Sequence, residues 1–462
     1  MPKSVLIIGG GLAGLTVAIR LGARGHAVTL LEEGRGLGGR LVAAGVRPAN
    51  IATSQSPSLR SPSEPQEALP PILLGSHRST FSLVETLGSG ARASSFHRLP
   101  LEFLLPDGPA VRWRHPWLPG PFHTLLALTI FRGLSFRDRW RALTWLERTW
   151  EGEPDLPIDL EHRTADDWLA AVGQSETARG KIWRPLARFL LGEDLTVVSA
   201  AMLVAMLARC FFAERNHSAI LMPAMGVGPL FLHPVRDQLV RSRATIRLEA
   251  AVRRIQFDSH GVTEVQLRTG ETLKADWYVA ALPHRSLCSL LPERVLAQYA
   301  YFEHMTKLSD ANALAVHLRF QRGPRPARLL LLAEGPYHWL VNRADAGSGG
   351  NGTRVSLVAT GSAANLERSD QELVDSALDV IKRAWPTWAE ARPLESCIVR
   401  EPHAFLSVRP GTRVLRPLQQ SPFPNFLLAG DWTDTGLPGT MESAIRSGDL
   451  CAEAIEEKEK RR

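Results

Sequence analysis

The residues with the clearest chemical meaning lie near the start of the sequence, in a glycine-rich motif. Gly9, Gly11 and Gly14 have the spacing GxGxxG, and Leu12 and Ala13 fall inside it. The first glycine allows a tight turn, the second lets the backbone approach a pyrophosphate, and the third permits close packing of a helix on a strand. Amide groups at the start of that helix then bind phosphate. The motif predicts a dinucleotide site.

An acid beyond the motif supports this prediction. Residues 5–8 and 27–31 are apolar and are expected to form two strands, with a helix over residues 15–23 between them. Glu32 ends the second strand, where an acid about 20 residues after the glycines accepts hydrogen bonds from the adenosine ribose. Glu33 is the alternative ribose ligand. Because strand, helix, strand and acid occur in this order, the sequence favours a nucleotide site over an ordinary glycine-rich turn.

A glycine pair followed by an arginine bears on which nucleotide binds. Gly38, Gly39 and Arg40 come just after the second strand. This pattern is typical of two-dinucleotide-binding flavoproteins, in which the loop runs along the pyrophosphate and the arginine neutralises it. The alternative interpretation is a surface turn with a solvated arginine. We therefore predict FAD, and not NAD, as the cofactor.

A second acid stands in the segment LLAGDWTDTGLPGTMESAIRSG, residues 427–448. Gly430 and Asp431 follow an apolar run that is expected to be a strand. Asp431 is predicted to bind ribityl or pyrophosphate-side hydroxyls. A helix that begins near Thr440, Met441 and Glu442 would direct its positive end at the flavin and stabilise negative charge on it. Both ends of the sequence are thus predicted to bind one FAD.

A further contact is expected from the middle of the chain. Residues 244–255 indicate a strand, a turn and a second strand, and residues 276–283 indicate another short strand. The backbone of Val252 is predicted to meet the adenine side of the cofactor. A valine that only packs in the core is the alternative.

Length and pattern predict an α/β protein of three units. A discontinuous Rossmann domain of the two-dinucleotide-binding type is expected from residues 1–75, 216–290 and 396–462, with a Pro/Ser-rich irregular loop at 47–71. Residues 76–215 are expected to form a helical substrate-facing or membrane-facing subdomain. Residues 291–395 are expected to form the mixed sheet of a substrate domain.

Composition and charge limit the classes of partner that the protein is expected to bind. The net charge is +7, but it is spread along the chain without basic blocks, which argues against nucleic acid. The four cysteines are isolated and show no metal-ligand spacing, so we expect no metal site, no disulfide framework and a cytoplasmic location. No apolar run is long enough to cross a bilayer. Residues 122–131 are apolar and precede a cluster of arginines. They indicate either a patch on the inner face of a membrane or a core helix beside a solvated face.

Longer segments resemble a known family. The glycine motif, Gly38-Gly39-Arg40 and the AGD sequence at 429–431 are similar to those of the amine oxidase and carotenoid desaturase superfamily. Residues 164–169 (TADDWL), 182–200, 400–417 and 423–448 resemble the squalene-associated FAD-dependent desaturases more specifically. These are hydroxysqualene dehydroxylases of bacterial squalene and hopanoid synthesis.

The resemblance implies a reaction in which reduced FAD gives hydride to an allylic carbon of hydroxysqualene as its hydroxyl leaves. An apolar tunnel would keep water from the allylic cation. A donor to the departing hydroxyl is needed. Asp434 is the candidate, and a solvated loop residue is the alternative. The resemblance also implies a polyisoprenoid lipid substrate and, as partners, the membrane surface and neighbouring squalene-pathway enzymes.

The sequence departs from this family in one place. Where members carry an acidic–polar–His stretch before an ILLG-like run, this chain has Pro70-Pro71, and His77 follows as the expected start of a helix. Three alternatives therefore stay open. They are a carotenoid desaturase, a flavin amine oxidase, and a non-catalytic FAD-containing scaffold. The four tyrosines all precede the C-terminal segment, which argues against the amine oxidase.

Overall fold

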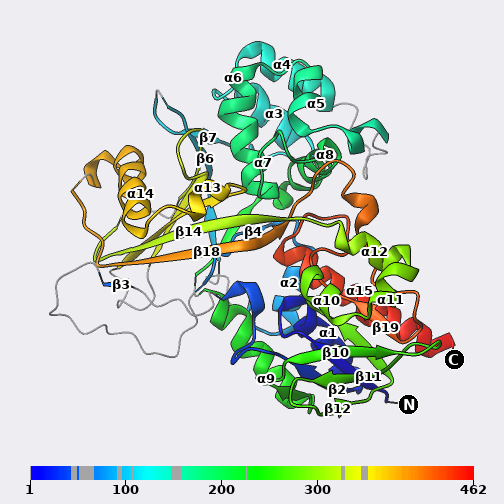
Figure 1. Cartoon of the computed structure of the whole chain (residues 1–462). Coiled ribbons are helices and arrows are strands. Elements are labelled where there is room, and N and C mark those ends of the chain that lie inside the picture. The colour runs from blue at the N-terminus through cyan, green and yellow to red at the C-terminus, as the bar shows by residue number, and fades with distance from the viewer. Residues whose placement is uncertain are drawn as a thin grey trace.

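Two large sheets organise the molecule, with helices packed on and between them (Figure 1). The structure is a computed structural model. It describes residues 2–42, 49–50, 67–90, 96–106, 108–146, 158–224, 226–323, 328–344, 352–388 and 390–461. One large sheet is parallel and the other is mixed, so the predicted α/β class, with a Rossmann-type domain and a separate mixed-sheet domain, is confirmed.

The parallel sheet forms the core of the first domain. Its strand order is β19-β13-β1-β2-β9, with β1 at Ser4–Ile8, β2 at Ala27–Leu31, β9 at Thr245–Arg247, β13 at Trp277–Ala280 and β19 at Phe426–Leu428. Apolar side chains of β1, β13 and β19 are almost wholly buried, as expected for strands that are covered on both faces. Segments from both ends of the sequence therefore lie in one sheet.

Helices cover one face of the parallel sheet. They are α1 (Leu12–Gly22), α2 (Arg78–Thr86), α9 (His233–Arg241) and α15 (Met441–Arg461). At the α1–α15 contact, a Cβ added to Gly448 would lie 2.6 Å from the carbonyl oxygen of Ala13. The two helices therefore pack backbone to backbone. This contact joins the predicted N-terminal nucleotide unit to the C-terminal helix (Figure 1).

Shorter elements pack on the other side of the parallel sheet. A three-stranded antiparallel sheet contains β10 (Val252–Phe257), β11 (Val262–Leu267) and β12 (Thr272–Leu273). Next to it lie α10 (His284–Leu290), α11 (Glu293–Gln298) and α12 (Ala300–Thr306). Side chains from these elements and from the parallel sheet share one apolar core.

The eight-stranded mixed sheet forms the second domain. Its order is β3-β18-β14-β17-β16-β15-β6-β7, and the strands are β3 (Ala49–Asn50), β6 (Leu101–Leu104), β7 (Val111–Trp113), β14 (Asp310–Phe320), β15 (Leu329–Leu332), β16 (Trp339–Ala344), β17 (Thr353–Thr360) and β18 (Glu395–Leu406). Helices α13 (Ala363–Leu366) and α14 (Asp370–Ala384) accompany it. The sheet thus includes β3, β6, β7 and β18, which lie outside the predicted 291–395 segment except for the first residue of β18.

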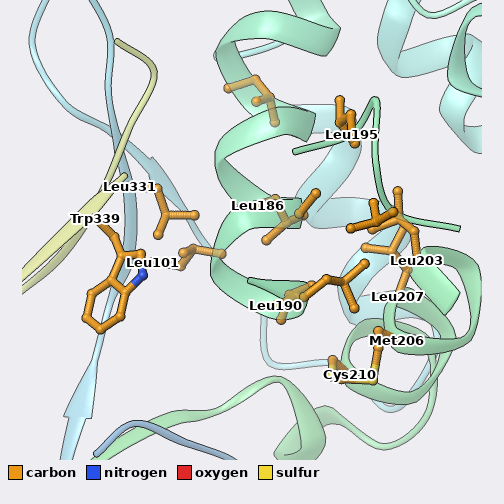
Figure 2. Close-up of a cluster of buried hydrophobic side chains, with 14 of the residues drawn as sticks. Leu101, Leu186, Leu190, Leu195, Leu203, Met206, Leu207, Cys210, Leu331 and Trp339 are labelled. Atoms are coloured by element: carbon orange, nitrogen blue, oxygen red, sulfur yellow. The ribbon is translucent and has the colours of Figure 1, made fainter. Parts of the chain in front are cut away.

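The helical subdomain lies beyond the mixed sheet (Figure 1). It contains α3 (Phe122–Ile130), α4 (Phe136–Leu146), α5 (Ala165–Ala171), α6 (Glu176–Ala178), α7 (Arg184–Leu191) and α8 (Ala200–Leu207). Figure 2 shows Leu186 and Leu190 of α7 between Leu203 and Leu207 of α8 on one side and strand residues of the mixed sheet, including Trp339, on the other. This shared core fixes α7 against the mixed sheet.

A further three-stranded sheet is formed by short strands from three separate segments of the chain. It has the order β4-β8-β5, with β4 at Leu73–Leu74, β5 at Phe96–Leu99 and β8 at Ile220–Pro223. Most of the predicted irregular loop at 47–71 lies outside the described residues. Of its described part, Glu67 is buried and forms an ion pair with Arg343 of β16. This part of the loop is therefore fixed to the mixed sheet.

Candidate active site

A cavity of about 550 Å³ lies between the two domains in the described part of the chain. Its lower part, here called the cradle, lies where the parallel strands end and is lined by residues 8–13, 31–33, 38–41, 250, 252, 268, 281–283, 286, 289, 290, 430, 431, 438–441 and 444. Its upper part, here called the apolar vault, is lined by residues 69–72, 74, 77, 188–192, 206, 339, 360, 404 and 405. Parallel sheets bind ligands in such positions, outside the carboxyl ends of their strands.

The three motif glycines take different positions in the cradle. A Cβ at Gly9 (φ 109°) would lie 2.3 Å from the carbonyl oxygen of Ala281, and one at Gly14 would lie 2.1 Å from that of Gly9. Both therefore allow close backbone packing. A Cβ at Gly11 would have no neighbour within 4 Å, and this residue lines the cavity at the start of α1. Gly11 thus presents open backbone to an entering group, as the motif predicts for pyrophosphate.

Glu32 is held in place by the backbone of the loops around it. Its Oε2 accepts a hydrogen bond from the Gly10 amide and its Oε1 accepts one from the Gly34 amide, both at 2.8 Å. These two amides fix the carboxylate at the end of β2. Glu33 also lines the cavity, but its side chain is exposed. The geometry favours Glu32 as the acid that receives ribose hydroxyls.

Arg40 and Asp431 meet in the cradle although 391 residues separate them in sequence. The Arg40 Nη2 atom lies 2.5 Å from Asp431 Oδ1, and Arg40 Nη1 donates to the carbonyl oxygen of Ala404 at 2.9 Å. Asp431 is buried, and its charge raises the pKa of Arg40. The pair ties the Gly38-Gly39-Arg40 loop, which lies beside Gly11, to the loop after β19, and both loops line the cavity.

The start of α15 faces the same space. Thr440 and Met441 line the cavity, and the Thr440 hydroxyl accepts a hydrogen bond from the Ser443 amide at 3.3 Å. Gly430 is fixed to the same helix because its amide donates to Ser447 Oγ at 2.8 Å. The positive end of the helix dipole is therefore directed into the cavity. This is the position that the sequence predicts for the flavin-facing helix.

The opposite end of the cradle is lined by residues of the antiparallel sheet and α10. Val252, at the start of β10, lines the cavity as expected. Arg268, which follows β11, lines it as well, and sequence reasoning missed this residue. No motif marks Arg268, because only the pairing of β10 with β11 brings it next to Val252. An exposed arginine here suits the phosphate or adenine side of a nucleotide.

The donors and acceptors of the cradle fit FAD. Open backbone at Gly11, the fixed carboxylate of Glu32, the Arg40–Asp431 pair and the start of α15 surround one continuous space. A pyrophosphate would contact the first two helical turns and Arg40, hydroxyls would contact the two acids, and a flavin ring would lie toward α15 and the vault. We assign these contacts from the donor set of the cradle.

Three predicted site residues lie elsewhere. Gly14 packs under the glycine loop, outside the cavity lining. Glu442 is buried and turns away from the cavity, because its carboxylate accepts hydrogen bonds from the amides of Ser79 and Thr80 at 2.9 and 2.8 Å. Asp434 also lies outside the lining, where its Oδ1 accepts a hydrogen bond from the Gly436 amide at 3.2 Å, and its role as a proton donor stays a prediction.

His77, which the sequence suggested was only the start of a helix, is a polar residue of the vault. It precedes α2, is buried, and lines the vault. Its Nδ1 accepts a hydrogen bond from the Leu74 amide at 3.4 Å, which assigns the ring proton to Nε2. Burial, together with the charge of Arg209, lowers the pKa of His77 to about 3. The ring is therefore neutral at physiological pH and has an N–H to donate.

Arg188 is the cation that lines the vault. It lies on α7, and its Nη2 is 2.7 Å from Asp194 Oδ2. Burial lowers the pKa of Arg188, although Asp194 opposes this shift. Apolar side chains surround these polar groups, namely Leu69, Ile72, Leu74, Phe189, Leu190, Leu191, Met206, Trp339 and Phe405. Sequence reasoning missed Arg188 because a helical arginine without tertiary context suggests a solvated face.

Comparison with known proteins places this site in a family. Residues 12–456 match the model of the flavin containing amine oxidoreductases. The chain is 25% identical to a 15-cis-phytoene desaturase of an Oncidium hybrid cultivar, over 98% of this chain and 78% of that protein. It is 24% identical to a zeta-carotene desaturase of Synechocystis sp., over 98% and 96% of the two chains.

Solved structures support the fold. An oxidoreductase from Methanosarcina mazei matches with a TM-score of 0.70 at 15% identity, and covers 98% of this chain and 100% of its own. A cyclohexylamine oxidase from Brevibacterium oxydans matches with a TM-score of 0.66 at 19% identity, over the whole of both chains. From the cradle and the family match together, the chain belongs to the flavin containing amine oxidoreductase family and is an FAD-dependent oxidoreductase.

Proposed function

We propose that this oxidoreductase acts on a polyisoprenoid, and that its reaction is the reductive dehydroxylation of hydroxysqualene to squalene. The observation that carries the proposal is the apolar vault, which opens directly onto the flavin end of the cradle. Most side chains that line it are aliphatic or aromatic. A long hydrocarbon gains about 25 cal/mol for each Å² of surface that it buries there.

The polar groups of the vault argue against an amine substrate. The acids that line the cavity are Glu32, Glu33 and Asp431, and all three belong to the cradle. Of the described residues that line the vault, none is a carboxylate, whereas Arg188 supplies a positive charge. None of the four tyrosines, all of which are described, lines the cavity. An ammonium group would therefore meet an arginine, already paired with Asp194, and no carboxylate among the residues that line the vault.

His77 gives the vault a hydrogen-bond donor for the hydroxyl of such a substrate. The FAD supplies the hydride chemistry when it is bound. The neutral ring of His77 holds a proton at Nε2, and no partner for this atom is seen among the described residues. Donation to the hydroxyl would stabilise negative charge on the oxygen as it leaves. The apolar side chains around it would exclude water from the cationic carbon.

Carotenoid desaturation is the second candidate. It is favoured by the relatives, since the phytoene and zeta-carotene desaturases match nearly the whole chain. That reaction takes hydride from a polyene and needs no donor to a leaving group. The role of His77 therefore separates the two candidates.

Product analysis tests the proposal directly. The purified protein, reconstituted with FAD and reduced under anaerobic conditions, is expected to convert hydroxysqualene to squalene. The same protein with oxidised FAD is incubated with phytoene and with zeta-carotene. Desaturated products from these incubations, without squalene from the first, would establish the second candidate. A flavin-loaded protein that is inert in all three would contradict both candidates and favour a scaffold role.

Variants of His77 test the mechanism. We expect His77→Ala to lower kcat for hydroxysqualene roughly 100-fold, because one donor to the developing charge is lost. His77→Gln, which keeps an N–H near the position of Nε2, is expected to lose less. Because the pKa of His77 is about 3, kcat should show no titration near pH 6.5 from this residue. Flavin absorbance checks that FAD content is unchanged, and His97→Ala, at an exposed histidine of β5, is the matched control.

A further inference from the structure

The helical subdomain exposes a concentration of large apolar side chains on its outer surface. Seven such side chains, 36–85% exposed, fall within one stretch of 24 residues, and they are Trp117, Leu118, Phe122, Leu126, Ile130, Phe136 and Trp140. Trp117 is 85% exposed and Phe136 is 76% exposed. We call these seven residues the aromatic face. Contiguous exposed apolar groups of this size mark interaction surfaces in folded proteins.

Helix periodicity places these residues on one side of their helices. In α3, the exposed Phe122, Leu126 and Ile130 recur at every fourth position, which is a single helical stripe. The buried residues of the same helix, His123, Thr124, Ala127 and Leu128, lie between them. Helix α3 therefore buries a mixed polar and apolar side and exposes an apolar side to solvent.

The next helix repeats this arrangement. Phe136 and Trp140 of α4 are both exposed and lie one turn apart. Figure 1 shows α3 and α4 together at the end of the molecule remote from the parallel sheet. The aromatic face thus lies far from the cradle, and it is not part of the cavity lining.

The segment that carries the aromatic face is basic. Residues 114–144 contain five arginines and one acid. The acid, Asp138, is buried, where it accepts hydrogen bonds from Ser135 and Ser175. Arg132 and Arg137 are exposed beside the apolar side chains. Residues 114–144, which carry the aromatic face, therefore have exposed cations and no exposed acid.

We propose that the aromatic face docks on the surface of an anionic lipid bilayer. Exposed Trp and Phe side chains enter the boundary between headgroups and acyl chains, and arginines beside them contact lipid phosphates. A second copy of the chain fits less well, because a symmetric dimer would bring the same arginines face to face. No helix in the described part of the chain is long and apolar enough to span a bilayer, so the docking is peripheral. The inference does not depend on the substrate.

Vesicle flotation tests this proposal with the flavin-loaded protein. Vesicles of phosphatidylcholine with phosphatidylglycerol are expected to carry the protein upward, and vesicles of phosphatidylcholine alone are expected to carry much less. Replacing Trp117, Phe136 and Trp140 together by serine should lower the bound fraction about tenfold or more. The double variant Arg132→Glu/Arg137→Glu should lose binding to the anionic vesicles to a similar extent, and high salt should do the same to the unmodified protein.

A matched control removes apolar area elsewhere. Val240, Val414 and Leu418 are 66%, 75% and 63% exposed and lie outside the aromatic face. Their triple serine variant is expected to bind anionic vesicles like the unmodified protein. Failure of the unmodified protein to float with anionic vesicles would overturn the proposal, and so would equal losses in the two serine variants. Light scattering measures the oligomeric state of the same proteins. If the unmodified protein is a dimer that does not bind vesicles, and only the aromatic-face variant is a monomer, the surface serves self-association instead.

Discussion

At the scale of single residues, local spacing predicts backbone roles better than side-chain directions. The roles of Gly9 and Gly11 follow from the motif, because tight turns and open backbone are decided within a few residues. Glu442 and His77 are different. The Glu442 carboxylate is bound by the start of α2, 362 positions earlier in the sequence, and His77 becomes a buried lining residue only because α7 and the mixed sheet enclose the vault. A linear pattern holds no information about such contacts.

Two glycine variants separate a binding role from a packing role. We expect Gly11→Ala to leave the stability of the FAD-free protein nearly unchanged, since its Cβ would have no neighbour within 4 Å and its φ is −77°. The same variant should weaken FAD binding at least about tenfold, because the methyl group enters the pyrophosphate path. Gly14→Ala should destabilise the protein by about 1–3 kcal/mol or more, because its Cβ would lie 2.1 Å from a carbonyl oxygen.

Urea denaturation of the FAD-free proteins and titration with FAD by flavin fluorescence provide the two measurements. The assignment would be contradicted if Gly11→Ala unfolded early and bound FAD normally.

At the scale of secondary structure, the strands of the parallel sheet are predicted closely. The observed Ala27–Leu31 strand matches the predicted range, and β1 begins at Ser4, one residue before its predicted start. Strands β6 and β7 were not predicted within the 76–215 segment. Their short apolar runs do not distinguish strand from helix by periodicity, and only their position at the edge of the mixed sheet decides the outcome.

The link between α2 and α15 gives a prediction at this scale. Glu442, the second residue of α15, is 2% exposed and receives three hydrogen bonds from the start of α2. We expect Glu442→Ala to reduce the free energy of unfolding by about 2–4 kcal/mol, because two backbone amides lose their acceptor. It should also lower kcat, since α2 begins directly after His77. Glu442→Gln keeps one acceptor oxygen, so its stability and kcat should lie between those of the unmodified protein and those of Glu442→Ala. Urea midpoints and steady-state rates are the readouts, and unchanged midpoints in both variants would refute the link.

At the scale of the whole molecule, buried neutral histidines couple folding to pH. Burial lowers the pKa of His77 and His338 to about 3 and that of His317 to about 4. In the unfolded chain these pKa values return to about 6.5. Below pH 6.5 the unfolded state therefore binds protons that the folded state does not, and stability falls as the pH falls, until it levels off near pH 3–4.

We expect acidification from pH 7 to pH 5 to cost about 2 kcal/mol for each of these histidines. His317 is the one to change, since it lies in the mixed sheet away from the cavity and pairs with Ser356 Oγ at 2.8 Å. His317→Gln should therefore lose about 2 kcal/mol less free energy of unfolding than the unmodified protein between pH 7 and pH 5. Urea midpoints at pH 7, 6 and 5 measure this, and identical pH slopes for the variant and the unmodified protein would contradict the assignment.

The clasp between Arg40 and Asp431 has a consequence for biosynthesis. A ribosome that adds about 5–20 residues per second needs roughly 20–80 seconds to extend the chain by the 391 positions from Arg40 to Asp431. Throughout that interval Arg40 has no Asp431 to pair with, and α1 is not yet covered by α15. Stable binding of FAD must therefore wait until Asp431 and α15 have been synthesised. A nascent chain in a flavin-starved cell would have no earlier chance to be stabilised, and its uncovered α1 surface would be available to chaperones and proteases.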